Sequence, residues 1–391
     1  MRIDLTENGP PVDVAIDDRV GVALRNSGIV TAVPSLATGW WTLGPAGKVG
    51  VAEVAGVELW IAPKLDIRRL FFLIGFARDQ KIWRDEDLAL HEEPDLLSAL
   101  AAAFARQASR ATEQGLLQGY RQVEEALPVL RGRLRSSDQL SRRFGLAIPL
   151  EVRYDEYDID IAENRLLRGA AEVLLKIPQV GPIARQQLRR LVRSMADVTP
   201  ARPGRNLPQW RASRLNARYH VALRLAELVL RGGSVDQTAG TVLVNGFVLD
   251  MAKVFEDFVT ASLGTALSTH GGHCRAQDRW HLDEAGHITM KPDLVWYRAS
   301  GHVAAVVDAK YKAEKPSGFP YADLYQMLAY CTALDLARGH LVYAKGNEPA
   351  TSHVVRNNGV EILQHTLDLT REPADLLAET ADLARLIAAG I

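Results

Sequence analysis

The sequence predicts an α+β protein with a β-rich N-terminal domain over residues 1–95, a mainly helical connecting region over 96–235 and a C-terminal α/β domain over 236–391. Three observations support this organisation. Short alternating runs rich in Val, Gly and Pro fill the first 65 residues or so, and longer helical periodicities follow. The last third alternates strand-like apolar runs with helical ones, which is typical of an α/β domain.

In the N-terminal region, Val49–Pro63 (VGVAEVAGVELWIAP) predicts two strands joined near Gly56. The neighbouring pair Trp40-Trp41 could form the tip of a hairpin that contacts a partner. Tryptophan more often anchors the core of a small β domain, and we favour that interpretation.

A glycine-rich segment, Gly44-Pro-Ala-Gly47-Lys48-Val49, superficially resembles a phosphate-binding loop. It has two residues between its glycines instead of four, and Val49 stands where Ser or Thr should bind Mg²⁺. We therefore expect a turn here, and we expect the chain to bind and hydrolyse no nucleotide by itself.

The connecting region predicts helices over residues 95–118, 164–176 and 215–230, with a strand-like stretch at 146–160 and a Pro/Gly-rich link at 199–208. Acids alternate near the end of the strand-like stretch, at Glu156, Asp158, Asp160 and Glu163. Their spacing indicates a polar strand face that leads into a helix, with Glu163 or Asn164 near the helix N-terminus. Structural capping of that helix is favoured over a metal site.

Arginine is concentrated in this region: residues 185–231 hold eleven arginines, no lysine and only two acids. Arginine binds phosphate oxygens well, so Arg189, Arg190 and Arg193 could belong to a track along a DNA backbone. A solvated helical face explains the same pattern, and both interpretations stay open. A smaller basic group, between Arg131 and Arg143, is equally ambiguous.

In the C-terminal region, an amphipathic helix is expected at Met251–Leu267. Two strands follow, in HITMKPDLVWYR (287–298) and HVAAVVDAKYK (302–312), joined by a turn at Ser300-Gly301. A helix at 321–336, a strand at 338–346 and a closing helix at 372–389 complete the pattern. This order predicts a central mixed sheet with helices packed on it.

The two adjacent strands carry candidate catalytic residues. Asp293 follows Pro292 within the first strand, and Asp308 and Lys310 stand after the apolar run VAAVV in the second. Residues two apart share a strand face, so Asp308 and Lys310 project together, and a hairpin through Gly301 brings Asp293 to the same end. Carboxylates that hold Mg²⁺, with a nearby cation, are what phosphodiester hydrolysis requires. A surface ion pair is the plain alternative for Asp308 and Lys310.

Two further elements favour the catalytic interpretation. Glu256 lies on the helix that precedes the strands. Gln326 and Tyr330 stand four apart on the following helix and therefore share a face.

The order Phe-Glu256-x-Phe, Pro-Asp293, Asp308-x-Lys310 and Gln326-x-x-x-Tyr330 resembles PD-(D/E)xK nucleases of the RecB-like type. Upstream segments at 61–77, 130–134 and 156–168 are similar to the McrC family, the nuclease subunits of McrBC modification-dependent restriction systems. Asp308 departs from the glutamate that many PD-(D/E)xK relatives carry, and the first fifty residues match least well.

The resemblance implies a DNA endonuclease subunit that cleaves methylcytosine-containing foreign double-stranded DNA with Mg²⁺ or Mn²⁺. Asp293, Asp308 and Glu256 would hold the metal, Lys310 would act on the water or the developing charge, and Gln326 and Tyr330 would support them. The implied partner is an McrB-like AAA+ GTPase ring, into which the N-terminal part would dock and whose hydrolysis it would stimulate.

Composition limits the alternatives. The net charge of −1 means that DNA contacts must come from local patches, and the two cysteines, Cys274 and Cys331, exclude a disulfide framework. The polar N-terminus is unlike a signal peptide and no apolar run is long enough to span a membrane, so a soluble cytoplasmic protein is expected. A stand-alone repair or recombination nuclease and a non-enzymatic adaptor of an AAA+ ring are the alternative functions.

Overall fold

A computed structural model describes residues 1–78, 96–144, 146–177, 180–204, 206–232, 244–311, 321–344 and 351–390. Contacts divide the chain into two compact units, residues 1–91 with 236–391 and residues 92–235. The N-terminal and C-terminal segments therefore belong to one unit, in which the second is inserted. The predicted α+β class is confirmed, with several sheets and helices in the described residues. The three-domain layout stays a prediction.

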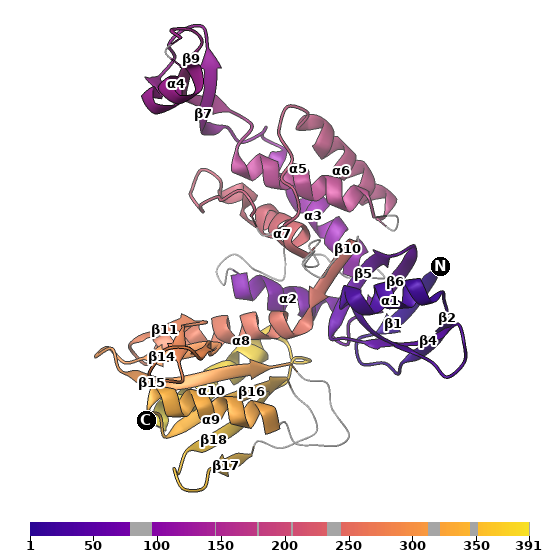
Figure 1. The fold of residues 1–391 in the computed structure, drawn as a ribbon, viewed down its shortest axis with the longest axis vertical. Helices are drawn as coiled ribbons and strands as arrows, with labels where there is room; N and C mark the ends of the chain where they lie inside the picture. The colour runs from indigo at the N-terminus through magenta and orange to yellow at the C-terminus, as the bar shows by residue number, and fades with distance from the viewer. Residues whose placement is uncertain are drawn as a thin grey trace. The chain divides into compact units, whose positions relative to one another are not determined.

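The N-terminal segment of the first unit holds two small sheets and two helices (Figure 1). Its elements are β1 (Arg2–Thr6), β2 (Val12–Ala15), α1 (Asp18–Ser27), β3 (Val30–Pro34), β4 (Trp40–Pro45), β5 (Lys48–Val54), β6 (Val57–Ala62) and α2 (Ile67–Arg78). Strands β5 and β6 form the predicted hairpin, with Ala55 and Gly56 in the left-handed conformation at its turn. Trp41 is 2% exposed and packs against Gly21, so its predicted core role is confirmed, whereas Trp40 is 44% exposed and the prediction is wrong for it.

The larger N-terminal sheet is completed by a strand from much later in the chain. Strand β10 (Val244–Asp250) pairs antiparallel with β5, which gives the strand order β1-β6-β5-β10. The strand runs directly into α8 (Met251–Ser268), whose first residue donates its backbone N–H to Gly47. An ion pair of 3.0 Å between Lys48 and Asp250 also holds the junction of β10 and α8 against the start of β5. The sheet therefore sets where α8 begins.

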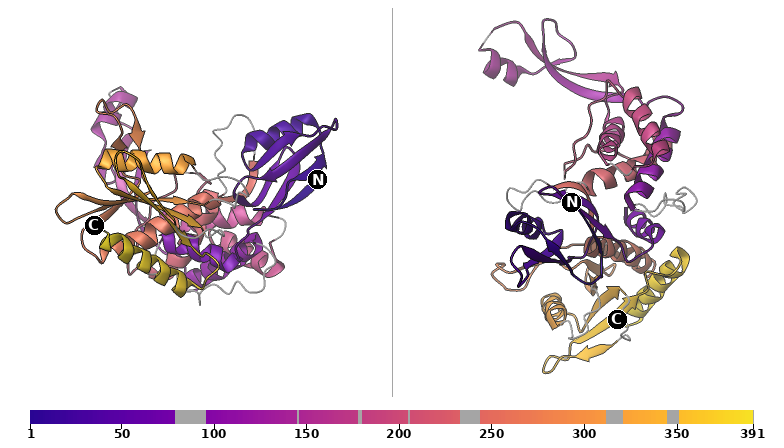
Figure 2. Two further views of the ribbon diagram at one scale, coloured as in Figure 1. Left: turned by 90° about the horizontal axis from the view of Figure 1, so that it is seen from below. Right: turned by 90° about the vertical axis from the view of Figure 1, so that its right-hand side faces the viewer.

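The C-terminal segment forms a six-stranded mixed sheet, as predicted, with the order β11-β14-β15-β16-β18-β17. Helix α9 covers one face of this sheet and α10 the opposite face, where α8 packs beside α10 (Figure 2). Strand β15 is buried along most of its length because helices cover both faces. The remaining elements are β11 (His273–Ala276), β12 (Trp280–His281), β13 (Thr289–Met290), β14 (Leu294–Tyr297), β15 (Val303–Lys310), α9 (Tyr321–Leu334), β16 (Arg338–Ala344), β17 (Ser352–Val354), β18 (Glu361–Leu367) and α10 (Pro373–Ala389).

The second unit combines a group of helices with a three-stranded sheet of order β7-β9-β8. Strands β7 and β9 form a long ribbon with α4 near its far end (Figure 1). The elements are α3 (Leu96–Thr112), β7 (Gly119–Leu127), β8 (Arg133–Leu134), α4 (Ser136–Arg143), β9 (Leu150–Asp158), α5 (Ala162–Leu175), α6 (Pro182–Ser194), a 3₁₀ turn (Ala217–Tyr219) and α7 (His220–Gly232). None of the helices in the described ranges combines the length and apolarity needed to cross a membrane.

Several element boundaries differ from the predictions. Helix α3 ends at Thr112 instead of residue 118, and Gly115 in the left-handed region follows it. Helix α7 starts at His220 instead of residue 215, after the 3₁₀ turn. The prediction that Pro292 and Asp293 lie within one strand is wrong, because the stretch splits into β13 and β14 with both residues between them.

Candidate active site

Asp293 and Asp308 meet where the hairpin of β14 and β15 opens. Leu294 pairs with Val307, so the residues that precede and follow this pair, Asp293 and Asp308, lie at the same end. The Asp293 Oδ2 atom accepts the backbone N–H of Ala309 at 2.8 Å. Both side chains are buried, with Asp293 8% and Asp308 2% exposed. The hairpin thus places two carboxylates next to each other in a largely dry environment.

Lys310 lies at the end of β15 and is held from two sides. Its ammonium forms an ion pair with Asp308 and donates a 3.0 Å hydrogen bond to Gln326 Oε1 on α9. Gln326 Nε2 in turn donates to the Tyr330 hydroxyl at 2.7 Å. Gln326 and Tyr330 share a face of α9, as predicted, and this face contacts the end of β15. Gln326 contacts Lys310 directly, and Tyr330 positions Gln326.

Glu256, from α8, reaches this group through a residue that the sequence analysis did not single out. The Gln277 amide donates to Glu256 Oε1 at 2.6 Å and to Asp293 Oδ1 at 3.3 Å. Lys253 also donates to Glu256 Oε1, at 2.7 Å. No sequence pattern marked Gln277, because it follows a strand of only four residues.

Burial and mutual repulsion shift the carboxyl groups strongly. Burial, and then the charge of Asp308, raise the pKa of Asp293 to about 8. Burial also raises the pKa of Asp308, against the opposing effect of Lys310. For Lys310 burial alone would lower the pKa, but the adjacent Asp308 carboxylate outweighs it and the pKa is raised. The site is therefore short of positive charge.

The donor set fits a hard divalent cation. Asp293 and Asp308 supply buried carboxylate oxygens next to each other, and the Lys310 ammonium contacts Asp308 Oδ2. Mg²⁺ commonly binds through one or two carboxylates and keeps several waters. Among the described residues no group of three or more His, Cys, Asp or Glu side chains is arranged to hold a metal. Asp293 and Asp308 would therefore be the primary protein ligands, and the predicted coordination by Glu256 stays a prediction.

The predicted DNA-binding arginines lie in the second unit. Arg189, Arg190 and Arg193 are exposed on α6, and Arg193 Nε donates to the Arg189 carbonyl at 3.2 Å. Arg185, one turn earlier, instead donates to the carbonyls of Leu175 and Ile177. Part of the arginine-rich segment is thus structural, and the outer face of α6 is accessible.

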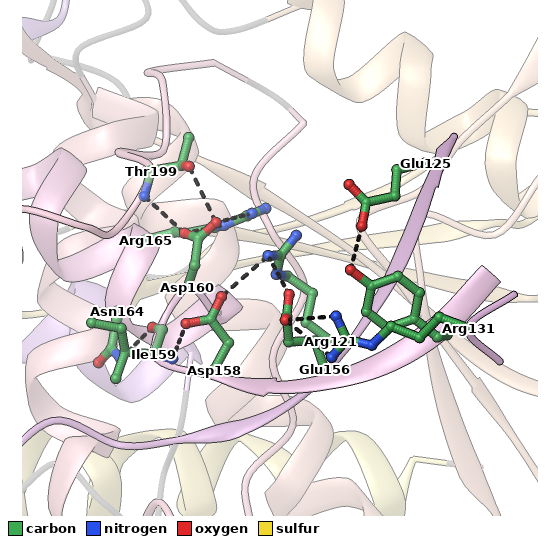
Figure 3. Close-up of polar contacts among 11 residues, drawn as sticks. Arg121, Glu125, Arg131, Glu156, Asp158, Ile159, Asp160, Asn164, Arg165 and Thr199 are labelled. Atoms are coloured by element: carbon green, nitrogen blue, oxygen red, sulfur yellow. Dashed lines mark hydrogen bonds and ion pairs between the residues drawn. The ribbon is translucent and has the colours of Figure 1, made fainter. Parts of the chain in front are cut away.

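The alternating acids at the end of β9 form ion pairs and hydrogen bonds with neighbouring side chains (Figure 3). Asp158 accepts from Arg121 at 3.1 Å, and Glu156 lies 3.3 Å from Arg131. Asp160 accepts from Arg165 and from both the N–H and the hydroxyl of Thr199. These contacts join the base of the ribbon to α5. Glu163 lies in the first turn of α5 as predicted, but the N-cap residue is Ile161, which makes no side-chain capping hydrogen bond.

Comparisons with known proteins define the family. A family model described as McrBC 5-methylcytosine restriction system component matches residues 44–344, well over half of the chain. The chain belongs to this family. The match begins at the end of β4 and includes Glu256, Asp293, Asp308, Lys310, Gln326 and Tyr330.

The fold of this McrBC family member is similar to that of a solved structure. A chain from an assembly of Thermococcus gammatolerans McrB AAA+ hexamers with bound McrC matches with a TM-score of 0.62 and 19% identity, over 99% of this chain and 100% of that one. A chain of the Thermococcus gammatolerans McrBC complex matches with a TM-score of 0.42 and 22% identity, over 68% of this chain and 88% of that one. No curated protein matches.

Proposed function

We propose that this McrBC family member is a Mg²⁺-dependent DNA endonuclease subunit that cleaves methylcytosine-containing foreign DNA. The observation that carries the proposal is the convergence of Asp293, Asp308 and Lys310 at one end of a buried hairpin. Two buried carboxylates beside a lysine cost stability, and ionisable groups kept at such a cost cluster at functional sites. The family description, a component of a 5-methylcytosine restriction system, supports DNA as the substrate.

Each side chain has a role in this scheme. Asp293 and Asp308 would hold the cation, which when bound activates water and neutralises charge on the phosphate. Lys310, oriented by Asp308 and Gln326, would hold the attacking water or stabilise the developing negative charge. The hydrogen bond between Gln326 and Tyr330 keeps the Gln326 oxygen directed at Lys310. The buried surroundings of the pair strengthen these electrostatic effects.

We also propose that the chain works with an McrB-like AAA+ GTPase ring, whose hydrolysis it stimulates. The similarity over 99% of the chain to a protein from an assembly of McrB hexamers with bound McrC supports such a partner. The N-terminal segment is our predicted docking part. Ala46 and Gly47 connect β4 and β5, and the segment from Gly44 to Lys48 lacks the spacing of a phosphate loop, so the partner would supply the GTPase. The purified chain alone should hydrolyse neither GTP nor ATP.

The substitutions Asp308→Ala and Asp308→Asn test the nuclease. Both should abolish cleavage of methylated DNA with Mg²⁺, while the far-UV spectrum and stimulation of a partner GTPase stay as in the wild type. Asp382→Ala is the control, since that exposed carboxylate pairs only with a neighbour on α10. EDTA should stop cleavage by the wild type. Undiminished cleavage by both Asp308 variants would refute the site. Full GTPase stimulation by a wild type that never cuts DNA would favour the adaptor function.

A further inference from the structure

Gln277 is the residue that joins Glu256 to the two-carboxylate site. It follows β11, where its backbone N–H donates to the Asp293 carbonyl at 3.1 Å and extends the pairing with β14. Its φ of +52° lies in the left-handed region, which residues other than Gly, Asn and Asp seldom occupy. This backbone conformation directs a long amide side chain toward the acids from α8 and the β14 hairpin.

The amide of Gln277 stands at a position where two carboxylate oxygens converge. Its nitrogen is 2.6 Å from Glu256 Oε1 and 3.3 Å from Asp293 Oδ1. Cis ligands of an octahedral Mg²⁺, with bonds of about 2.1 Å, lie roughly 3 Å apart. The two observed separations fall on either side of that spacing.

We propose that Gln277 is a further ligand of the cation in the proposed nuclease, and that its amide turns over to present Oε1. A terminal amide has an oxygen and a nitrogen in nearly the same shape, so the turn exchanges a donor for an acceptor. Before the cation binds, Nε2 holds the two carboxylates together. Once it binds, Oε1 adds a hard neutral oxygen beside those carboxylates.

The inference rests on the proposed function, and it differs measurably from a purely structural role. If Gln277 only donates to the carboxylates, it competes with the cation for their oxygens. Removing its side chain would then leave cation affinity unchanged or increase it. If Gln277 is a ligand, removal weakens binding and leaves a coordination position for one more water.

The experiment measures cation binding by the full chain without DNA. Mn²⁺ affinity is determined by calorimetry, and the waters on bound Eu³⁺ are counted from luminescence lifetimes in H₂O and D₂O. Gln277→Leu and Gln277→Gly should bind Mn²⁺ about tenfold more weakly or worse, and Eu³⁺ should gain one water. The glycine variant suits the left-handed backbone and should fold even if the leucine variant does not. Gln277→Glu retains an oxygen and should keep the wild-type water count.

Two controls separate the possible failures. Gln186→Glu makes the same change at an exposed position on α6 and should bind like the wild type. Asp308→Asn should lose most Mn²⁺ affinity. If it binds as well as the wild type does, the proposed metal site itself is refuted. If Asp308→Asn loses affinity while Gln277→Gly binds Mn²⁺ as tightly as the wild type with no added water, only the role of Gln277 is overturned.

Discussion

The hydroxyl of Tyr311 lies beside the buried carboxylate of Glu7, which stands about three hundred residues earlier in the chain. Glu7 is 2% exposed, and its Oε2 atom accepts the backbone N–H of Lys64 at 2.9 Å. Tyr311 directly follows Lys310, and its ring contacts that of Phe255, beside Glu256. Burial, and then the charge of Glu7, raise the pKa of Tyr311. Glu7, which directly follows β1, therefore contacts the residue next to the candidate catalytic lysine.

Replacement of Tyr311 by Phe tests this connection. The variant removes the polar hydroxyl beside the buried Glu7 carboxylate, so the free energy of unfolding should fall by about 1 to 3 kcal/mol. Urea denaturation measures the difference. Tyr325→Phe, at an exposed tyrosine of α9, is the matched control and should be neutral. Equal stability of the two variants would mean that the Glu7 contact contributes nothing.

Gln326 should matter for the rate of DNA cleavage through its contact with Lys310. Gln326→Leu removes the acceptor that orients the ammonium, so single-turnover cleavage should slow by about ten- to hundredfold. Gln326→Glu keeps an acceptor oxygen and should retain more activity than the leucine variant. A leucine variant with the wild-type rate would show that Asp308 alone positions Lys310.

Acid should weaken the second unit through Asp160. Hydrogen bonds from Arg165, against the effect of burial, lower the pKa of Asp160 to about 2 from an ordinary value of 3.8. A depressed folded-state pKa stabilises the fold above pH 3.8, and this contribution disappears as the pH falls through 2.

Asp160→Asn should therefore reduce the free energy of unfolding by about 2 kcal/mol at pH 7. The difference in free energy of unfolding between the variant and the wild type should shrink as the pH falls below 3.8. Denaturation curves at several pH values measure it, with Asp382→Asn, which removes an exposed carboxylate, as the control. If this difference does not change with pH, the lost stability would come from the changed hydrogen-bond geometry and not from the lost charge.

The outer face of α6 should reveal whether it follows DNA by its response to salt. If Arg189, Arg190 and Arg193 contact phosphates, their joint replacement by Gln should reduce the slope of log K against log salt by about 0.9 per contact. The triple variant should also bind every DNA sequence more weakly by the same factor, because phosphate contacts do not distinguish bases. Arg185→Gln, on the same helix but bonded to two carbonyls, should change stability and leave the slope intact. An unchanged slope in the folded triple variant would mark the face as solvated surface.

The sequence predicts those parts of the candidate site that depend on local spacing. Asp308 and Lys310 lie two apart on one strand, and Gln326 and Tyr330 lie four apart on one helix, so periodicity alone groups each pair. Asp293 was placed at the correct end of the hairpin, although Pro292, which has no N–H to donate, keeps it outside the strand.

What the sequence does not predict depends on distant partners. Gln277 follows a four-residue strand whose pairing with β14 is visible only in the fold. Strand β7 has polar residues on both faces and gains its structure from β9, so its pattern lacks the alternation of a half-buried strand. The contact between Glu7 and Tyr311 joins the N-terminal and C-terminal segments of the first unit.

The pairing of β5 with β10 has a consequence for how the protein folds during synthesis. Strand β5 is complete at Val54, but its partner leaves the ribosome only after the inserted unit of residues 92–235 has been made. At synthesis rates of about 5 to 20 residues per second, the edge of β5 waits on the order of ten seconds or more. The inserted unit can fold in that interval, while the N-terminal sheet keeps an open edge that is prone to mispairing. Final assembly of the first unit is thus a late event that needs both of its segments.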